Sequence, residues 1–328
     1  MAAIVRVLPS GHEFVVEHDE PLLAAALRSG LALEFGCTNG ACGECRARVV
    51  EGEVRRIRYH DYVIREADKR AGVVLLCCSS ADQDVTIEAG EAGGPDDIPV
   101  QNVRARLYRQ QLVGGDTAIV HLRVMRGRAL RFLAGQHVRV EAQGCGAADV
   151  SIASCPCDGL NLELHLGPGD AGALGERARA GFRKSDRFAI EGPRGRFVLD
   201  EGSDRPLLFL AQGTAIAPVK SIIEHAVNLE LEQSMRLYWY AHTRAGHYLH
   251  NYFRSLDDAL DEFAYVPVEG GVDVHPPTEP PDAGALDAYL AGGESFVEAA
   301  RAALLERGAR EERVFIDALN RRPDGKEG

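Results

Sequence analysis

Three cysteines lie close together near the start of the chain. They are spaced C-x4-C-x2-C, at Cys37, Cys42 and Cys45, and a fourth follows at Cys77 in the segment VVLLCCSS. Three thiolates from one loop can wrap a small inorganic core, and the fourth must then come from elsewhere in the fold. This spacing is typical of [2Fe–2S] sites. Glycines at positions 36, 40 and 43 suit such a loop, because they accept unusual dihedrals and let backbone N–H groups approach the sulfurs.

A structural zinc site is the competing interpretation of these cysteines. Zinc sites favour C-x2-C pairs, which a C-x4-C-x2-C loop with one distant cysteine matches poorly. The spacing therefore favours an iron–sulfur cluster. Either Cys77 or Cys78 can supply the fourth thiolate. We prefer Cys77, because it directly follows the apolar run Val73–Leu76 that would place it, and Cys78 is then a free thiol.

Composition indicates an acidic globular protein. The 328 residues suggest two or three domains, and the contents of 45% hydrophobic and 26% charged residues are ordinary. A net charge of −12 argues against a nucleic-acid-binding surface over the whole chain. No apolar run approaches the ~18 residues of a membrane span, and no secretory signal opens the chain. We therefore expect a cytoplasmic protein that binds neither membrane nor nucleic acid directly.

The segments around the cysteines predict a small β-grasp domain over residues 1–92. Alternating apolar residues indicate strands, and a proline before and a glycine after an apolar run indicate a helix. The expected elements are a hairpin of Ile4–Val7 and Phe14–Val16, a helix over Leu22–Arg28 and a final strand over Asp84–Ala89. Here the sequence resembles the ferredoxin domain of oxygenase reductases.

The middle of the chain predicts an antiparallel barrel over residues 100–202. A Gly/Pro/Asp stretch at 90–99 indicates a linker. Short strands separated by turns follow it, as in small barrels. These strands are expected over Val103–Arg109, Ala118–Val124, His137–Glu141, Asn161–Leu166 and Arg187–Glu191.

The last third, residues 203–328, predicts a doubly wound parallel sheet. Strands and helices alternate there, and ligands of such sheets bind at the carboxyl ends of the strands. Strands are expected at Pro206–Ala211, Arg236–Tyr240 and Arg313–Ile316, and helices at Val219–Val227 and Phe296–Arg307. The fold class is thus α+β and α/β in three domains.

A turn near the end of the barrel segment carries a family resemblance. The sequence GPRGRF at 192–197 is similar to the G-P-x-G-x-F turn of the ferredoxin–NAD(P)H reductase superfamily. Together with the domain order, it makes the whole chain resemble the one-chain reductases of ring-hydroxylating oxygenases. In those proteins hydride passes from NADH to FAD, and single electrons leave through the cluster.

The resemblance implies a flavin site with altered contacts. The family motif R-x-Y-S-x-x-S corresponds to AADVSIAS here, so Ala148 replaces the arginine that holds the flavin diphosphate and Val150 replaces the ring-stacking tyrosine. A Gly-rich turn should supply the second phosphate contact, but it lacks the usual hydroxyl and contains Asp170. These losses predict loosely held FAD. The implied flavin residues are Ser151, Ile152, Ala153, Ser154, Gly169, Ala171 and Gly172.

The nicotinamide motifs are altered as well. Where the family has A-G-G-T-G-I-A-P, this chain has A-Q-G-T-A-I-A-P, and side chains there obstruct the approach of a pyrophosphate to bare backbone. Tyr240 replaces a later glycine, and His242 replaces an arginine. The family's C-G-P motif is replaced by Ala291-Gly292-Gly293, and its D-x-F motif is replaced by Asp317-Ala318-Leu319. A Pro-rich stretch occupies residues 274–281. The implied residues of this nicotinamide-like site are Gly213, Thr214, Ala215 and Pro218. The changes predict poor use of NAD(P)H.

Two functions follow from this pattern. The chain is either a working NADH-dependent reductase of an oxygenase, or a reductase-like electron carrier that takes hydride poorly. The second would exchange electrons with a partner ferredoxin or other electron-transfer protein, and a transcription regulator would respond to its redox state. That description resembles the ferredoxin-reductase-like regulators of aromatic degradation, such as that of tetralin. Because the fold-bearing positions persist while the cofactor motifs are altered, we favour the regulatory carrier.

Overall fold

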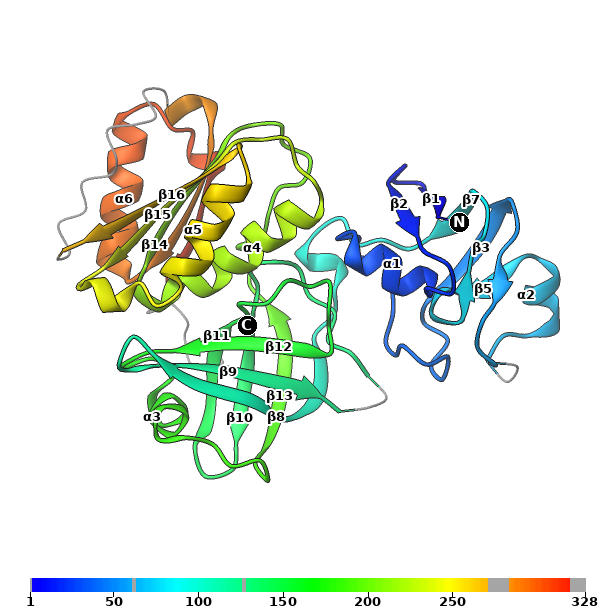
Figure 1. The fold of residues 1–328 in the computed structure, drawn as a ribbon, viewed down its shortest axis with the longest axis horizontal. Helices are drawn as coiled ribbons and strands as arrows, with labels where there is room; N and C mark the ends of the chain where they lie inside the picture. Colours follow the sequence, from blue (N-terminus) through cyan, green and yellow to red (C-terminus); the bar gives the residue numbers. More distant parts are fainter. Residues whose placement is uncertain (1, 61–62, 126–127, 271–282, 319–328) are drawn as a thin grey trace.

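The computed structural model describes residues 2–60, 63–125, 128–270 and 283–318. Its three larger sheets follow one another along the chain, as Figure 1 shows. The first and second sheets each have one hydrophobic core, whereas the third has a core on each face. The mixed α+β and α/β fold class expected from the sequence is confirmed. No helix among the described residues is long and apolar enough to cross a membrane. The Pro-rich stretch 274–281 and Leu319 lie outside the described residues.

The N-terminal sheet is mixed and has the strand order β2-β1-β7-β3-β5. The predicted hairpin, helix and final strand are all present, and α1 buries its apolar face against this sheet. After β5, a single 3₁₀ turn at Leu76–Cys78 carries Cys77. The elements are β1 (Ala3–Leu8), β2 (Glu13–Val16), α1 (Leu22–Arg28), β3 (Arg46–Glu51), β4 (Arg55–Arg56), α2 (Glu66–Arg70), β5 (Val73–Leu75), β6 (Ser79–Ser80) and β7 (Val85–Ala89).

The second sheet is antiparallel, in the order β11-β10-β13-β8-β9-β12. A single bridge between Ile152 and Leu164 joins its two outer strands and closes the barrel. The expected strands are present, but the sequence did not indicate β11, which coincides with the altered flavin motif. The elements are β8 (Gln101–Val113), β9 (Thr117–Val124), β10 (His137–Ala142), β11 (Gly146–Ser151), β12 (Asn161–Leu166), α3 (Gly172–Ala180) and β13 (Arg187–Arg194).

The third sheet is parallel, in the order β16-β15-β14-β17-β18. Helices α4 and α5 cover one face and α6 the other (Figure 1). The chain runs outward from β14 in both directions, so the strand order reverses beside β14, where doubly wound sheets bind ligands. The elements are β14 (Leu207–Gln212), α4 (Ile216–Asn228), β15 (Met235–Ala241), α5 (His250–Ala259), β16 (Phe263–Glu269), β17 (Asp287–Gly292), α6 (Glu294–Glu306) and β18 (Val314–Ala318).

The N-terminal domain contacts both of the others. The Ala129 N–H, just after β9, donates to the Gly36 carbonyl beside the first cysteine over 2.8 Å. Gly30 lies so close to α4 that a Cβ atom added there would be 2.7 Å from Leu229 and 3.2 Å from His225. These contacts fix the cysteine loop relative to the barrel and to the parallel sheet.

Candidate functional site

The four predicted cysteine ligands lie together as two pairs of sulfurs. The Sγ atoms of Cys37 and Cys42 are 3.1 Å apart, and those of Cys45 and Cys77 are 3.3 Å apart. Among the described residues, no group of three or more His, Cys, Asp or Glu side chains is arranged to hold a single metal ion. Two sulfur pairs instead suit a core of two irons, each with two thiolates. The arrangement therefore fits a [2Fe–2S] cluster better than a zinc ion.

Backbone N–H groups surround these sulfurs. The Cys42 N–H donates to the Cys37 sulfur over 3.3 Å, and the Glu44 N–H donates to the Cys42 sulfur over 3.4 Å. The hydrogen bond between the sulfurs of Cys45 and Cys77 lowers the pKa of Cys45 to about 7 and raises that of Cys77. A metal binds the thiolate form, which Cys45 therefore reaches more readily than Cys77.

Cys78 lies beside the site but outside the two pairs. Its sulfur is 3.6 Å from that of Cys77, and a Cβ added at Gly40 would be 2.6 Å from it. Cys78 thus packs beneath the turn at Gly40, where φ is +81°. The geometry favours Cys77 as the fourth ligand.

A small cavity of about 100 Å³ lies where the flavin ring is expected. Three of the seven predicted flavin residues line it, namely Ser151, Gly169 and Ala171. The Ser151 hydroxyl donates to Asp317 Oδ2 over 3.2 Å. The other four predicted residues are Ile152, Ala153, Ser154 and Gly172, and they do not line this cavity.

The charge of this cavity does not favour a diphosphate. Among the described residues, no lysine or arginine lines it, but Asp149 and Asp170 do. Asp149 Oδ1 is buried without a hydrogen bond, and the nearest guanidinium, that of Arg139, is 3.8 Å away. Asp170 Oδ2 accepts from the Gly167 N–H over 2.7 Å and from the Thr214 hydroxyl over 2.6 Å. The charge of the cavity therefore disfavours the flavin diphosphate, and loose binding of FAD stays a prediction.

A larger crevice of about 520 Å³ opens at the carboxyl ends of β14, β15, β16 and β17. Gly213 and Thr214 line it, and no atom of the described residues, apart from Gly213 and its chain neighbours, lies within 4 Å of the position that a Cβ at Gly213 would take, where φ is +56°. Ala215 and Pro218 do not line it but are buried where α4 begins. The barrel turn at Gly114, Asp116 and Thr117 forms part of the wall. Sequence reasoning missed that turn, because only the tertiary fold brings it here.

The residues that replace the expected glycines narrow the crevice without filling it. Gln212 Oε1 accepts a hydrogen bond from the Gly293 N–H over 3.2 Å, so this side chain spans the ends of β14 and β17. Tyr240 packs edge-on against Phe296, with ring centroids 5.2 Å apart. Burial raises the pKa of Tyr240 to about 12, so its phenol stays neutral at physiological pH.

A buried polar network joins the barrel to the parallel sheet. Lys220 on α4 is 2.7 Å from Glu224 and 3.4 Å from Glu163 on β12, and it donates to the Ala153 carbonyl over 3.2 Å. Burial would raise the pKa of Glu163, but the hydrogen bond from His165 and the charge of Lys220 hold it at about 2. The network joins α4, β12 and Ala153, and no pattern within any one of these segments indicates it.

The altered flavin motif is part of this junction. The Ser221 hydroxyl donates to the Ser154 carbonyl over 2.7 Å, and the Ser154 hydroxyl accepts from the Glu163 N–H over 3.2 Å. Residues 153 and 154 therefore connect the two domains through polar contacts.

Comparisons with known proteins match this architecture. Residues 5–82 match the family described as 2Fe-2S iron-sulfur cluster binding domain. The chain is 30% identical to the CDP-6-deoxy-L-threo-D-glycero-4-hexulose-3-dehydrase reductase of Yersinia pseudotuberculosis, over 97% of this chain and 99% of that protein. It is 28% identical to the reductase component of phenol 2-monooxygenase from Pseudomonas sp., over 99% and 96%. A crystal structure of an Amycolatopsis cytochrome P450 reductase superposes with a TM-score of 0.61 at 25% identity, covering 97% and 98%.

Proposed function

Because the chain belongs to the family of ferredoxin-reductase-type proteins with an N-terminal [2Fe–2S] domain, we propose that it is an electron-transfer oxidoreductase. It takes hydride from a nicotinamide nucleotide and delivers single electrons to an acceptor protein, as a reductase component does. The supporting observation is that the large crevice and the small cavity expected to bind flavin adjoin each other, because Asp170 and Thr214 line both. A donor and a flavin bound in them would be neighbours, which a direct hydride transfer requires.

The proposal assigns a role to each predicted group of residues. FAD, when bound, exchanges two electrons with a hydride donor and one at a time with a cluster. Its cavity is lined by Ser151, Gly169 and Ala171, and the two segments that carry them also contain Ile152, Ala153, Ser154 and Gly172. Gly213 and Thr214 line the nicotinamide crevice, and the buried residues Ala215 and Pro218 support them from the start of α4. Cys37, Cys42, Cys45 and Cys77 hold the cluster.

The remaining residues position these sites. Asp317 orients the Ser151 hydroxyl, and Lys220 ties α4 to the carbonyl of Ala153. Asp170 and Thr214 set the spacing between the barrel and the parallel sheet through their hydrogen bond. Rigid positioning of this kind keeps donor and acceptor groups within reach.

A second candidate is the regulatory carrier. Two observations support it. Gln212 bridges to the Gly293 N–H, and no lysine or arginine among the described residues lines the small cavity expected to bind flavin. Such a protein would be reduced by a partner ferredoxin, and a transcription regulator of aromatic catabolism would read its redox state. The first candidate needs fewer further partners, so we place it first.

Rapid mixing of the anaerobic holoprotein with NADH or NADPH separates the two. Bleaching of the visible flavin and cluster bands within seconds, at sub-millimolar nucleotide, supports the reductase. Reduction that is slow with both nucleotides, but fast with a reduced ferredoxin, supports the carrier. Flavin content after gel filtration measures in the same sample how firmly FAD is held.

A further inference from the structure

Three arginines form a row across the outer face of the barrel. Arg106 on β8 lies directly opposite Arg187 on the neighbouring strand β13 and opposite Arg123 on the neighbouring strand β9. All three are exposed. Like charges directly opposite each other on neighbouring strands destabilise a sheet. A row of three therefore suggests a purpose other than stability.

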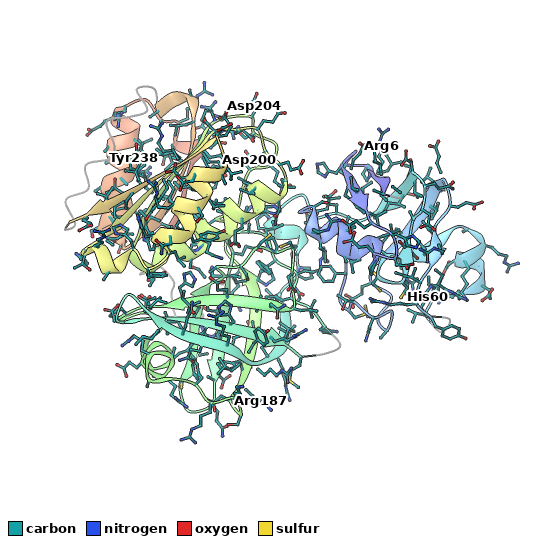
Figure 2. All side chains as sticks on the ribbon, in the orientation of Figure 1. Arg6, His60, Arg187, Asp200, Asp204 and Tyr238 are labelled. Carbon is teal, nitrogen blue, oxygen red and sulfur yellow. The ribbon has the colours of Figure 1, made fainter. Side chains whose placement is uncertain are left out.

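This row forms one wall of a cleft of about 730 Å³. Arg58 and Arg128 also line the cleft, so the described residues contribute five arginines and no acidic side chain to its lining. In Figure 2, Arg187 lies at the lower end of the barrel and His60, two residues after Arg58, at the lower side of the N-terminal domain. We call this feature the arginine cleft.

The cysteine loop forms the other wall. Thr38 and Asn39, which directly follow Cys37, line the arginine cleft. The Arg58 guanidinium donates to the Thr38 carbonyl over 2.7 Å and to that of Cys77 over 3.4 Å. A molecule held in the cleft would therefore contact the loop that carries the proposed cluster ligands.

Among the described residues, the five arginines have no acidic partner to neutralise them. Many arginines elsewhere pair with carboxylates, as Arg55 does with Asp82 and Arg196 with Asp96. Within the part of the chain that the structure describes, none of the five cleft arginines forms an ion pair with an acidic side chain. This local excess of positive charge occurs in a chain of net charge −12.

We propose that the arginine cleft binds an acidic surface of the protein that accepts electrons from this chain. The inference rests on the proposed function and adds the chemistry of the partner. Guanidinium groups bind carboxylates in bidentate fashion, and a positive cleft raises the rate of encounter with a negative partner. In the complex one electron leaves this chain and the acceptor gains it; no bond forms and no proton moves.

Duplex nucleic acid fits the cleft less well. Its phosphate charge continues along its whole length. A duplex would therefore run from the cleft onto the surface of a chain with net charge −12. An acidic patch on a protein can end where the arginines end.

The test measures binding first, so that it does not depend on hydride transfer. The holoprotein is titrated calorimetrically with an acidic plant-type [2Fe–2S] ferredoxin, both proteins oxidised, at low and at physiological salt. The variant is Arg106→Gln with Arg187→Gln. The matched control is Arg183→Gln with Arg310→Gln, which removes the same charge from exposed positions that do not line the cleft. Electron transfer to the ferredoxin is then followed after dithionite reduction, with basic cytochrome c as a second acceptor.

The cleft variant should bind ferredoxin about tenfold more weakly at low salt and transfer electrons to it correspondingly more slowly. The control variant and transfer to cytochrome c should change less than about twofold. Unfolding in urea should begin no earlier in the cleft variant, since substitution relieves repulsion between arginines. Equal losses in both variants, no loss in either, or tighter binding of duplex DNA or inorganic pyrophosphate at the cleft would each overturn the inference. Failure of NADH to reduce the protein would instead count against the proposed function alone.

Discussion

The hydroxyl of Thr214 donates a hydrogen bond to the carboxylate of Asp170 over 2.6 Å, and the two residues belong to different domains. Asp170 lies in the Gly-rich turn of the barrel, whereas Thr214 follows the first strand of the parallel sheet. Both line the two adjoining cavities. One carboxylate thus holds the domains in register and also places a negative charge where the family binds phosphate.

Replacing Asp170 with asparagine should strengthen flavin binding. Asparagine can still accept from Thr214, but it removes the charge that repels a diphosphate. We expect the dissociation constant of FAD to fall about tenfold, or ~1.4 kcal/mol. Fluorescence titration of the apoprotein with FAD measures this. Asp204→Asn, at an exposed carboxylate that does not line the cavity, is the control. Unchanged or weaker binding by the Asp170 variant would show that its charge does not limit affinity.

Replacing Gln212 with glycine should improve reduction by NADH. The change restores the family glycine and removes the side chain that bridges to the Gly293 N–H. A pyrophosphate can then approach bare backbone. We expect kcat/KM for NADH to rise about tenfold, chiefly through a lower KM. Steady-state reduction of ferricyanide measures both constants. Gln212→Asn, which keeps a side chain there, should stay near the parent value, and a gain as large as that of glycine would refute this explanation.

Serine substitutions should distinguish the adjacent thiols Cys77 and Cys78. The Cys77 sulfur pairs with that of Cys45, whereas Cys78 packs beneath Gly40. We expect Cys77→Ser to lose most of its iron and sulfide and its visible circular dichroism, and Cys78→Ser to retain them. Far-ultraviolet circular dichroism checks that both variants fold. The reverse pattern would make Cys78 the ligand.

Removing the buried Lys220 cation should strongly destabilise the junction of the barrel and the parallel sheet. Lys220→Met leaves the carboxylates of Glu163 and Glu224 without their shared cation. Breaking a buried pair in this way costs about 3–5 kcal/mol. Urea unfolding gives the free energy. Lys184→Met, at an exposed position, should cost less than about 0.5 kcal/mol. A loss that small at Lys220 would mean that the network contributes little to stability.

We expect mild acidification to destabilise the protein through the same junction of the barrel and the parallel sheet. Burial lowers the pKa of His165 below the unfolded value of about 6.5. As pH falls through about 6.5, the unfolded chain binds a proton that the folded chain does not, so the free energy of unfolding falls. Glu163, whose folded pKa is about 2, contributes stability that is lost only below an unfolded pKa of about 4.3.

Unfolding in urea between pH 7.5 and 5.5 measures this effect. His165→Gln should reduce the slope with pH, by at most ~1.4 kcal/mol per pH unit. A part of the slope should remain, because burial also lowers the pKa of His121. An identical slope in the variant would show that His165 does not carry the effect.

Local patterns predicted those elements that have one polar and one apolar face or a clear boundary. The helix over Leu22–Arg28 was found because a proline precedes it and a glycine follows it. Strand β17 is buried on both faces, shows no alternation and was not predicted, whereas the similarly buried β14 was indicated by its continuous apolar run. Strand β11 was not predicted, because its residues were assigned only to the flavin motif.

The sequence by itself determined the chemistry of the cluster, because the spacing of Cys37, Cys42 and Cys45 places three thiolates on one loop whatever surrounds it. Tertiary structure decided the relationships between distant segments. It paired Cys77 with Cys45, set Asp170 against Thr214, and aligned Arg187, Arg106 and Arg123 across three strands. Strand register and domain packing, rather than nearness in the chain, bring such residues together, and a single sequence carries no local signal of either.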